Sequence, residues 1–284
     1  MSLTLLGILN AQAAAGGGYP AVAGYFSRGN GATTVYKWAF PTDIVTTTTA
    51  SPAGMQFGSG FSDPSVAGYF SRGQNTTTIY KWTFPADTVT TTTAAGGGLE
   101  VHAGFADPAV AGYFARSNNT STVYKWAFPT DTRTTTTGSP AIMNANAGFE
   151  NRAVAGYFSR GNGNTTVYKW TFPADTVTTT TAAPLGMSYH AGFADPAVAG
   201  YFSKGQDSPM YKWAFPSDTV STTTSAPQNL GGLEGAFADP AVAGYIAQAG
   251  YATNIHKWAF PSDTVSASTA APATIYGNAG FADA

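Results

Sequence analysis

The sequence predicts an all-β protein: a six-bladed β-propeller of 44-residue, four-stranded repeats, with the ring closed by the C-terminal strand. Three observations predict this fold. The chain repeats with a constant period, each period reads as short strands separated by turns, and the two chain ends carry complementary parts of one repeat.

The period is marked by a Gly-Tyr motif and by the tryptophans. AGYF, or AGYI, recurs every 44 residues and places tyrosines at Tyr25, Tyr69, Tyr113, Tyr157, Tyr201 and Tyr245. The tryptophans follow the same spacing, with a one-residue offset in the fifth repeat, at Trp38, Trp82, Trp126, Trp170, Trp213 and Trp258. Fixed landmarks with drift confined to turns indicate stacked copies of one unit.

Each unit reads as four short strands. In the first unit they are 21–28, 34–40, 45–49 and a stretch that ends near Phe61, and the turns between them contain Gly29-Asn30-Gly31 and Pro41-Thr42-Asp43. The third strand is rich in threonine and polar on both faces, so we expect it at the outer rim. We expect the Ala- and Gly-rich strand 21–28 nearest the axis, because small side chains let six strands converge.

The second strand of each unit carries a triplet of aromatic rings. Tyr36, Trp38 and Phe40 alternate along it, so all three project from one face. Burial of such a triplet contributes at most about 11 to 19 kcal/mol of stability. A single sheet cannot cover its own aromatic face, so this stability requires a neighbouring sheet. Because the first and last units carry nearly the same rings as the others, neither is a polar cap. The tryptophans are therefore expected to pack between the blades of a closed ring.

The chain ends predict how the ring closes. The junction between units reads GF(A/S)DP(A/S)VAGYF, but the N-terminal copy begins only at Pro20 and the C-terminal copy stops after Asp283. We expect 279–283 to supply the strand that the first blade lacks. Residues 1–18, apolar and ending in Gly16-Gly17-Gly18, are expected to form a docking arm and hinge, with 19–284 as the propeller. A cleaved secretion signal is the alternative for the arm.

Composition excludes several classes of protein. The formal net charge is -2, from 13 Lys and Arg against 15 Asp and Glu, which disfavours a nucleic-acid partner. The absence of cysteine excludes disulfides and thiolate metal sites. No apolar run approaches the ~18 residues that a membrane span requires.

Most acidic residues occupy repeated turn positions. One set comprises Asp43, Asp87, Asp131, Asp175, Asp218 and Asp263, and the other Asp63, Asp107, Asp195, Asp239 and Asp283. Short carboxylates beside proline cap their own turns, so we expect structural roles. The less favoured alternative is a cation held on the axis by a ring of carboxylates. We expect no metal and no cofactor.

Two basic sets also repeat. Lys37, Lys81, Lys125, Lys169, Lys212 and Lys257 are expected to pack on the sheet with their ammonium groups near a turn aspartate. Alternatively, this ring of charge faces a channel or an anionic ligand. Arg28, Arg72, Arg116, Arg160 and Lys204 lie beside the hairpin turn, where propellers usually meet ligands, and are the candidate ligand-binding residues. Gln248 interrupts this set in the sixth unit.

Catalysis normally requires a unique constellation of unlike groups. The unrepeated acids are Glu100, Glu150, Asp207 and Glu234, and the histidines are His102, His190 and His256. They are scattered over different units without a metal-binding spacing, so we expect no enzymatic activity. Variation concentrates instead in the hairpin turns and in the long connections between units, and a fixed scaffold with changeable loops is typical of a binding surface.

The repeat AGYFSRGN(x)TTVYKWAFPTDTVTTTT resembles the kelch-like propeller repeats in virion proteins of tailed bacteriophages, over nearly the entire chain from Pro20 to Asp283. The resemblance implies a non-enzymatic tail or fibre component of the virion, used for attachment or host recognition. It also implies that residues 1–18 bind other virion proteins, with a host-surface glycan as the candidate ligand. A secreted, carbohydrate-binding propeller lectin is the alternative.

Overall fold

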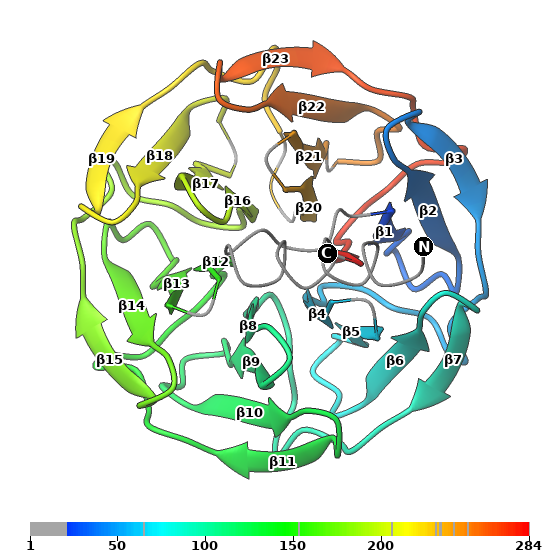
Figure 1. The fold of residues 1–284 in the computed structure, drawn as a ribbon, viewed down its shortest axis with the longest axis horizontal. Helices are drawn as coiled ribbons and strands as arrows, with labels where there is room; N and C mark the ends of the chain where they lie inside the picture. Colours follow the sequence, from blue (N-terminus) through cyan, green and yellow to red (C-terminus); the bar gives the residue numbers. More distant parts are fainter. Residues whose placement is uncertain are drawn as a thin grey trace, which may run out of the picture.

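The computed structural model describes residues 22–283, apart from positions 65, 153, 206, 231, 233, 234, 241 and 249. Within these residues the chain forms six antiparallel sheets of four strands each, arranged radially around one axis (Figure 1). The prediction of an all-β, six-bladed β-propeller is therefore confirmed. The predicted docking arm, residues 1–18, lies outside the described residues.

Each blade is a sheet of four strands, described here from the axis outward. The innermost strands are β24 (Gly280–Ala282), β4 (Gly60–Asp63), β8 (Ala103–Asp107), β12 (Gly148–Asn151), β16 (Gly192–Asp195) and β20 (Ala236–Asp239). The second strands are β1 (Ala23–Ser27), β5 (Ala67–Ser71), β9 (Ala111–Ala115), β13 (Ala155–Ser159), β17 (Ala199–Ser203) and β21 (Ala243–Ala247). We number the blades 1 to 6 in this order.

The two outer layers carry the aromatic triplets and the threonines. The third strands are β2 (Val35–Ala39), β6 (Ile79–Thr83), β10 (Val123–Ala127), β14 (Val167–Thr171), β18 (Met210–Ala214) and β22 (Ile255–Ala259). The outermost strands are β3 (Ile44–Thr47), β7 (Thr88–Thr91), β11 (Thr132–Thr135), β15 (Thr176–Thr179), β19 (Thr219–Thr222) and β23 (Thr264–Ala267). The outermost strands are exposed or half-buried, as predicted for threonine-rich strands at the rim.

The prediction that the AGYF strand lies nearest the axis is wrong. The strand at the axis is the Gly-Phe-Ala-Asp strand, and AGYF is the second strand of every blade. The AGYF strand needs a glycine for a different reason, because the phenylalanine ring of a neighbouring blade lies against it. A Cβ on Gly68 would lie 1.9 Å from the ring of Phe281, and one on Gly112 would lie 1.9 Å from the ring of Phe61.

The ring closes through the C-terminal strand, as predicted. Strand β24 pairs antiparallel with β1, with Tyr25 opposite Phe281, and completes blade 1 as its innermost strand. The Asp283 carboxylate accepts hydrogen bonds from the backbone N–H groups of Val22, at 2.7 Å, and Ala23, at 2.9 Å. One carboxylate thus fastens the last described residue to the first.

The hydrophobic core lies between the blades. Six clusters of buried residues occur in the described chain, and each is shared by two adjacent blades. One of them joins Trp82 and Phe70 of blade 2 to Tyr25 and Phe281 of blade 1. All six tryptophans are 0% exposed. The sheets therefore become stable by covering each other's aromatic faces.

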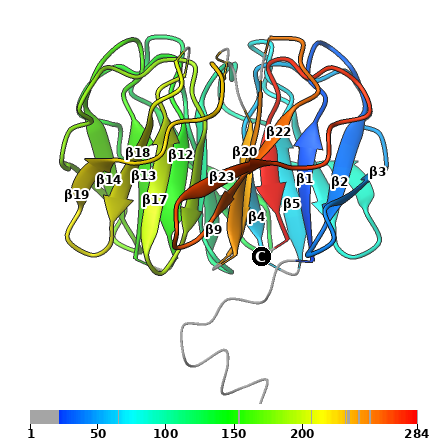
Figure 2. The same cartoon turned by 90° about the horizontal axis from the view of Figure 1, so that it is seen from above.

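The disc has two unlike faces (Figure 2). The hairpin turns between second and third strands and the long connections between blades lie on one face, which we call the loop face. The Asp-Pro turns and the short turns between third and outermost strands lie on the opposite face, which we call the turn face, together with the C-terminus.

Candidate recognition face and axial channel

The predicted ligand-binding set lies on the loop face, at the ends of the second strands. The Nε–H groups of its arginines donate to backbone carbonyls of the connection from the preceding blade: Arg28 to Thr274 at 3.3 Å, Arg72 to Gly54 at 3.0 Å, Arg116 to Gly98 at 2.8 Å and Arg160 to Ile142 at 3.3 Å. These side chains are half-buried. Each arginine therefore holds a variable connection against the next blade, and binding of a ligand by the set stays a prediction.

The two exceptions in this set behave differently. Gln248 of blade 6 donates from Nε2 to the carbonyl of Asn229 at 3.1 Å, so an amide takes over the arginine's contact with the connection. Lys204 instead forms an ion pair with Asp207 in its own hairpin turn. In the sequence Gln248 interrupts the basic set, but in the structure it makes the same kind of contact with a connection carbonyl as the arginines do.

A collar of loop residues surrounds the mouth of the axis on the loop face. Backbone hydrogen bonds connect neighbouring blades here, from Phe57 N–H to the Gly277 carbonyl at 2.6 Å and from Val101 N–H to the Phe57 carbonyl at 2.7 Å. The collar residues have left-handed backbones, including Phe57 (φ 60°), Val101 (φ 44°) and Tyr189 (φ 52°). Bulky and β-branched residues adopt this conformation at a cost of order 1–3 kcal/mol each, so the surrounding scaffold imposes it.

An aromatic cluster of one exposed and two half-buried residues lies where blades 6, 1 and 2 meet on this face. Tyr251, from the hairpin turn of blade 6, stacks on Tyr276 with ring centroids 4.6 Å apart and planes inclined by 2°. Phe57 contacts the edge of Tyr276 at 5.8 Å. We call these three residues the aromatic platform. The sequence showed each of them in a variable segment, but it did not reveal that the three segments converge.

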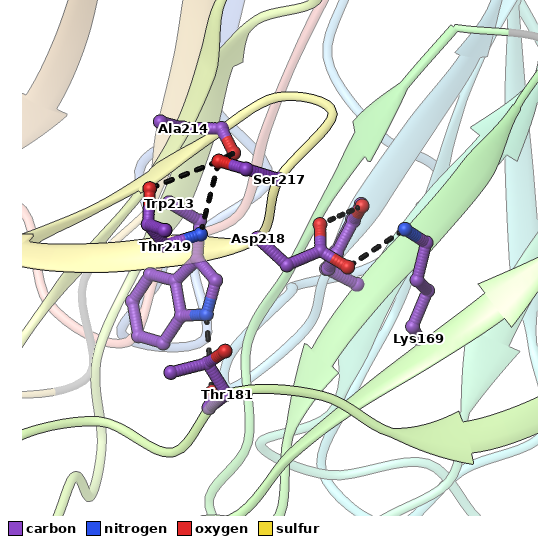
Figure 3. Close-up of polar contacts among 8 residues, drawn as sticks. Lys169, Thr181, Trp213, Ala214, Ser217, Asp218 and Thr219 are labelled. Atoms are coloured by element: carbon purple, nitrogen blue, oxygen red, sulfur yellow. Dashed lines mark hydrogen bonds and ion pairs between the residues drawn. The ribbon is translucent and has the colours of Figure 1, made fainter.

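The repeated lysines and turn aspartates form a latch between adjacent blades. The lysine Nζ lies 2.7–2.8 Å from one carboxylate oxygen of an aspartate in the next blade, and the hydroxyl of the AGYF tyrosine donates to the other oxygen at 2.7–2.8 Å. Figure 3 shows Lys169 of blade 4 reaching Asp218 of blade 5 in this way. The latch occurs at all six blade interfaces.

The latch also changes the chemistry of its tyrosine. Two effects raise the pKa of Tyr25 and of its five equivalents far above the ordinary value: burial, which is the larger effect, and the hydrogen bond to the aspartate. The lysine Nζ lies 5.2–5.4 Å from the centroid of the same ring. The tyrosine therefore stays a neutral donor, and the lysine charge is neutralised inside the scaffold instead of facing a channel.

Substitution of one latch aspartate should weaken the ring measurably. Asp131→Asn removes the charge that Lys81 and the Tyr69 hydroxyl share, and we expect the free energy of unfolding to fall by about 1–3 kcal/mol. Asp207→Asn is the matched control, because Asp207 is exposed and its ion pair is at the surface. Urea unfolding of both variants measures the difference, and equal losses would contradict the role of the latch.

The channel along the axis is divided by a ring of small residues. Gly60, Gly104, Gly148, Gly192, Ala236 and Gly280 of the innermost strands form this waist. A Cβ on the five glycines would lie only 2.3–2.8 Å from a backbone oxygen of the neighbouring blade. The waist separates a cavity of about 60 Å³ on the loop-face side from one of about 80 Å³ on the turn-face side.

The cavity on the loop-face side is lined by His102, His190, Asn146 and Asn278. The two histidines are 3% and 4% exposed, their rings contact Phe114 and Phe202, and none of their ring nitrogens has a hydrogen-bond partner within the described residues. Burial lowers the pKa of His102 and of His190 to about 3. Both side chains are therefore neutral imidazoles over the ordinary pH range.

The cavity on the turn-face side contains the charged residues of a blade that departs from the junction motif. Where blades 2, 3 and 5 read Gly-Phe-(Ala/Ser)-Asp-Pro and blade 6 reads Ala-Phe-Ala-Asp-Pro, blade 4 reads Gly-Phe-Glu-Asn-Arg, which places Glu150 and Arg152 at the axis. Burial raises the pKa of Glu150 to about 7, against the lowering effects of the Arg152 charge and a backbone hydrogen bond from Ala106. The sequence identified Glu150 as unrepeated, and its place beside Phe149 was the signal for an axial position.

The aspartates of the Asp-Pro turns are buried and do not form a metal site among the described residues. Asp63, Asp107, Asp195 and Asp239 are 4–6% exposed, and burial raises the pKa of each carboxyl, that of Asp239 to about 6. Across the described residues, no three His, Cys, Asp or Glu side chains converge as metal ligands would. Glu234 lies outside the described residues. The described part of the chain also has no helix capable of crossing a membrane.

Neither a protein-family model nor a curated protein sequence matches this chain.

Proposed function

We propose that this protein is a non-enzymatic recognition protein that binds its ligand on the loop face of the propeller. The observation that carries the proposal is the distribution of sequence variation. Strand residues are nearly identical in all six blades, whereas the loop face changes from blade to blade. A rigid scaffold that presents variable loops on one face is how binding surfaces are commonly built.

The composition of the loop face supports recognition of a polar ligand. Its hairpin turns are made of small and amide residues, among them Asn30, Gln74, Asn118, Asn119 and Asn162. Gly, Ser, Asn and Tyr are the residues that antibody loops use, because amides adapt their hydrogen bonds and tyrosine supplies rigid contact area. The four arginines at the ends of the second strands donate their Nε–H groups to backbone carbonyls of the connections, which orders the loops around them.

Within this proposal, the resemblance to kelch-like repeats favours a tail or fibre component of a tailed-phage virion that serves attachment or host recognition. Residues 1–18 would then bind another virion protein. The second candidate is a free carbohydrate-binding lectin, favoured by the aromatic platform. The two candidates share the loop face as the ligand site and differ in whether the protein assembles into a particle.

Binding assays, co-purification with virions and one deletion variant test the proposal. Glycan-array and host-cell binding of the purified chain should be positive for both candidates, and no binding in either assay would contradict recognition. Co-purification with virions separates the candidates, because only the virion component should be found in particles. A variant that lacks residues 1–18 should keep its fold and its ligand but leave the particle, and continued assembly would contradict the docking role of the arm.

A further inference from the structure

Tyr251 is a side chain that the fold does not require. The residue is 57% exposed, and its backbone is left-handed, with φ at 64°. The same position in other hairpin turns is occupied by Gly31, Asn75, Asn119 and Gly163, which are residues suited to positive φ. A tyrosine here is strained and gains little from burial, and such outliers concentrate at functional sites.

The platform presents one free aromatic face. Tyr251 and Tyr276 are parallel at 4.6 Å, so each covers one face of the other, and the edge contact of Phe57 with Tyr276 supports the lower ring. Close packing beneath the platform fixes Phe57, because a Cβ on Gly277 would lie 2.5 Å from the Phe57 ring. The outer face of Tyr251 is therefore an oriented, rigid surface that needs no reorganisation to bind a ligand.

Neutral hydrogen-bonding groups border the platform. Asn30 is exposed and donates its backbone N–H to the Tyr276 carbonyl at 2.9 Å, so this residue lies next to Tyr276. Gln56 precedes Phe57 in the chain, and its Oε1 accepts a hydrogen bond from Gln74 Nε2 at 3.4 Å. Arg28 also lies next to the platform: its backbone carbonyl accepts the Tyr276 N–H, and its Nε–H donates to the Thr274 carbonyl.

We propose that the aromatic platform binds a neutral hexopyranose, with the C–H face of the sugar stacked on Tyr251 and its hydroxyls bonded to the bordering amides. This inference deepens the function proposed above and rests on it. A pyranose presents an apolar face and a rim of hydroxyls, which matches a single aromatic face rimmed by amide donors and acceptors.

The test uses a substitution that the chain itself makes in other blades. Tyr251→Gly introduces the residue found at Gly31 and Gly163 and relieves the strained backbone, so the variant should fold at least as well as the parent. We expect the parent to bind neutral hexose-terminated glycans on an array and methyl hexopyranosides in calorimetric titration. Tyr251→Gly should weaken that binding at least tenfold, whereas Tyr251→Phe should keep it within about threefold.

Asn119→Gly, the same change in the hairpin turn of blade 3, is the matched control and should leave binding unaltered. Equal affinity of the parent and Tyr251→Gly for its glycan would overturn this inference but leave recognition by the loop face intact. A loss caused by Asn119→Gly alone would move the site to blade 3. Binding of nucleotides or aromatic peptides in place of sugars would refute the ligand class, and a parent that binds neither glycans nor cells would refute the proposed function as well.

Discussion

Removal of residues 279–284 is expected to lower the free energy of unfolding by at least about 4 kcal/mol, because Phe281 alone is worth about 3–5 kcal/mol as a buried ring. Phe281 is 4% exposed, and its centroid lies 4.4 Å from that of Phe70 and 5.0 Å from that of Tyr25. The truncation also removes the pairing of β24 with β1, which joins three residue pairs from Gly24–Ala282 to Phe26–Gly280. It therefore leaves β1 as an unpaired edge strand.

Chemical denaturation followed by tryptophan fluorescence measures the loss, and a rescue variant makes the test specific. In the rescue variant, Ala-Gly-Phe-Ala-Asp is moved from the C-terminus to a position directly before Pro20, in place of residues 1–19. This rebuilds the junction that links the other units and should restore most of the stability. If the truncated chain unfolds at the parent's denaturant midpoint, or if the rescue variant is no better than the truncated one, closure by this strand is not what stabilises the ring.

The period and the chain ends were sufficient to predict the ring and its closure, because each repeat carries the same aromatic faces. The order of strands within a blade was harder to predict, because two strands contain small residues for unlike reasons. At the waist, Gly104 leaves no space for a side chain because its Cβ would lie 2.3 Å from the carbonyl oxygen of Gly60. In the AGYF strand, Gly112 makes space for the ring of Phe61, and the sequence alone does not distinguish these two causes.

The sequence also could not predict which side chains contact each other across blade boundaries. Lys37 was expected near a turn aspartate, and the nearest in its own unit is Asp43, but its partner is Asp87 of the next blade. The repeat makes Asp43 and Asp87 equivalent, so only the packing of adjacent sheets selects one. The aromatic platform is similar, because Phe57 and Tyr276 are far apart in the chain and meet only when the ring closes.

The second large effect is expected in acid, and it arises from His102 and His190. In the folded protein their pKa values are about 3, whereas the ordinary value of 6.5 applies to the unfolded chain. The unfolded state therefore binds protons first as pH falls. The stability associated with the neutral imidazoles is fully present above pH 6.5 and is lost progressively between pH 6.5 and about 3. At pH 5 the loss should be about 2 kcal/mol for each histidine.

His102→Asn with His190→Asn isolates this effect, because asparagine occupies the equivalent positions Asn146 and Asn278. Above pH 7 the free energies of unfolding of parent and double variant should differ by a constant amount. By pH 5 the parent should have lost about 4 kcal/mol more, since the two histidines lie in different blades and should act additively.

Other titrating groups cancel in this comparison. The buried carboxyls, including Asp239 and Glu150, have raised pKa values and act in the opposite direction on acidification, and they are present in both proteins. His256, whose pKa is also lowered by burial, is likewise common to both. Parallel stability curves from pH 8 to pH 5 would therefore mean that the two imidazoles reach a proton acceptor or water in the folded ring. A divergence that begins below pH 6.5 is the signature of neutral histidines held without partners between the blades.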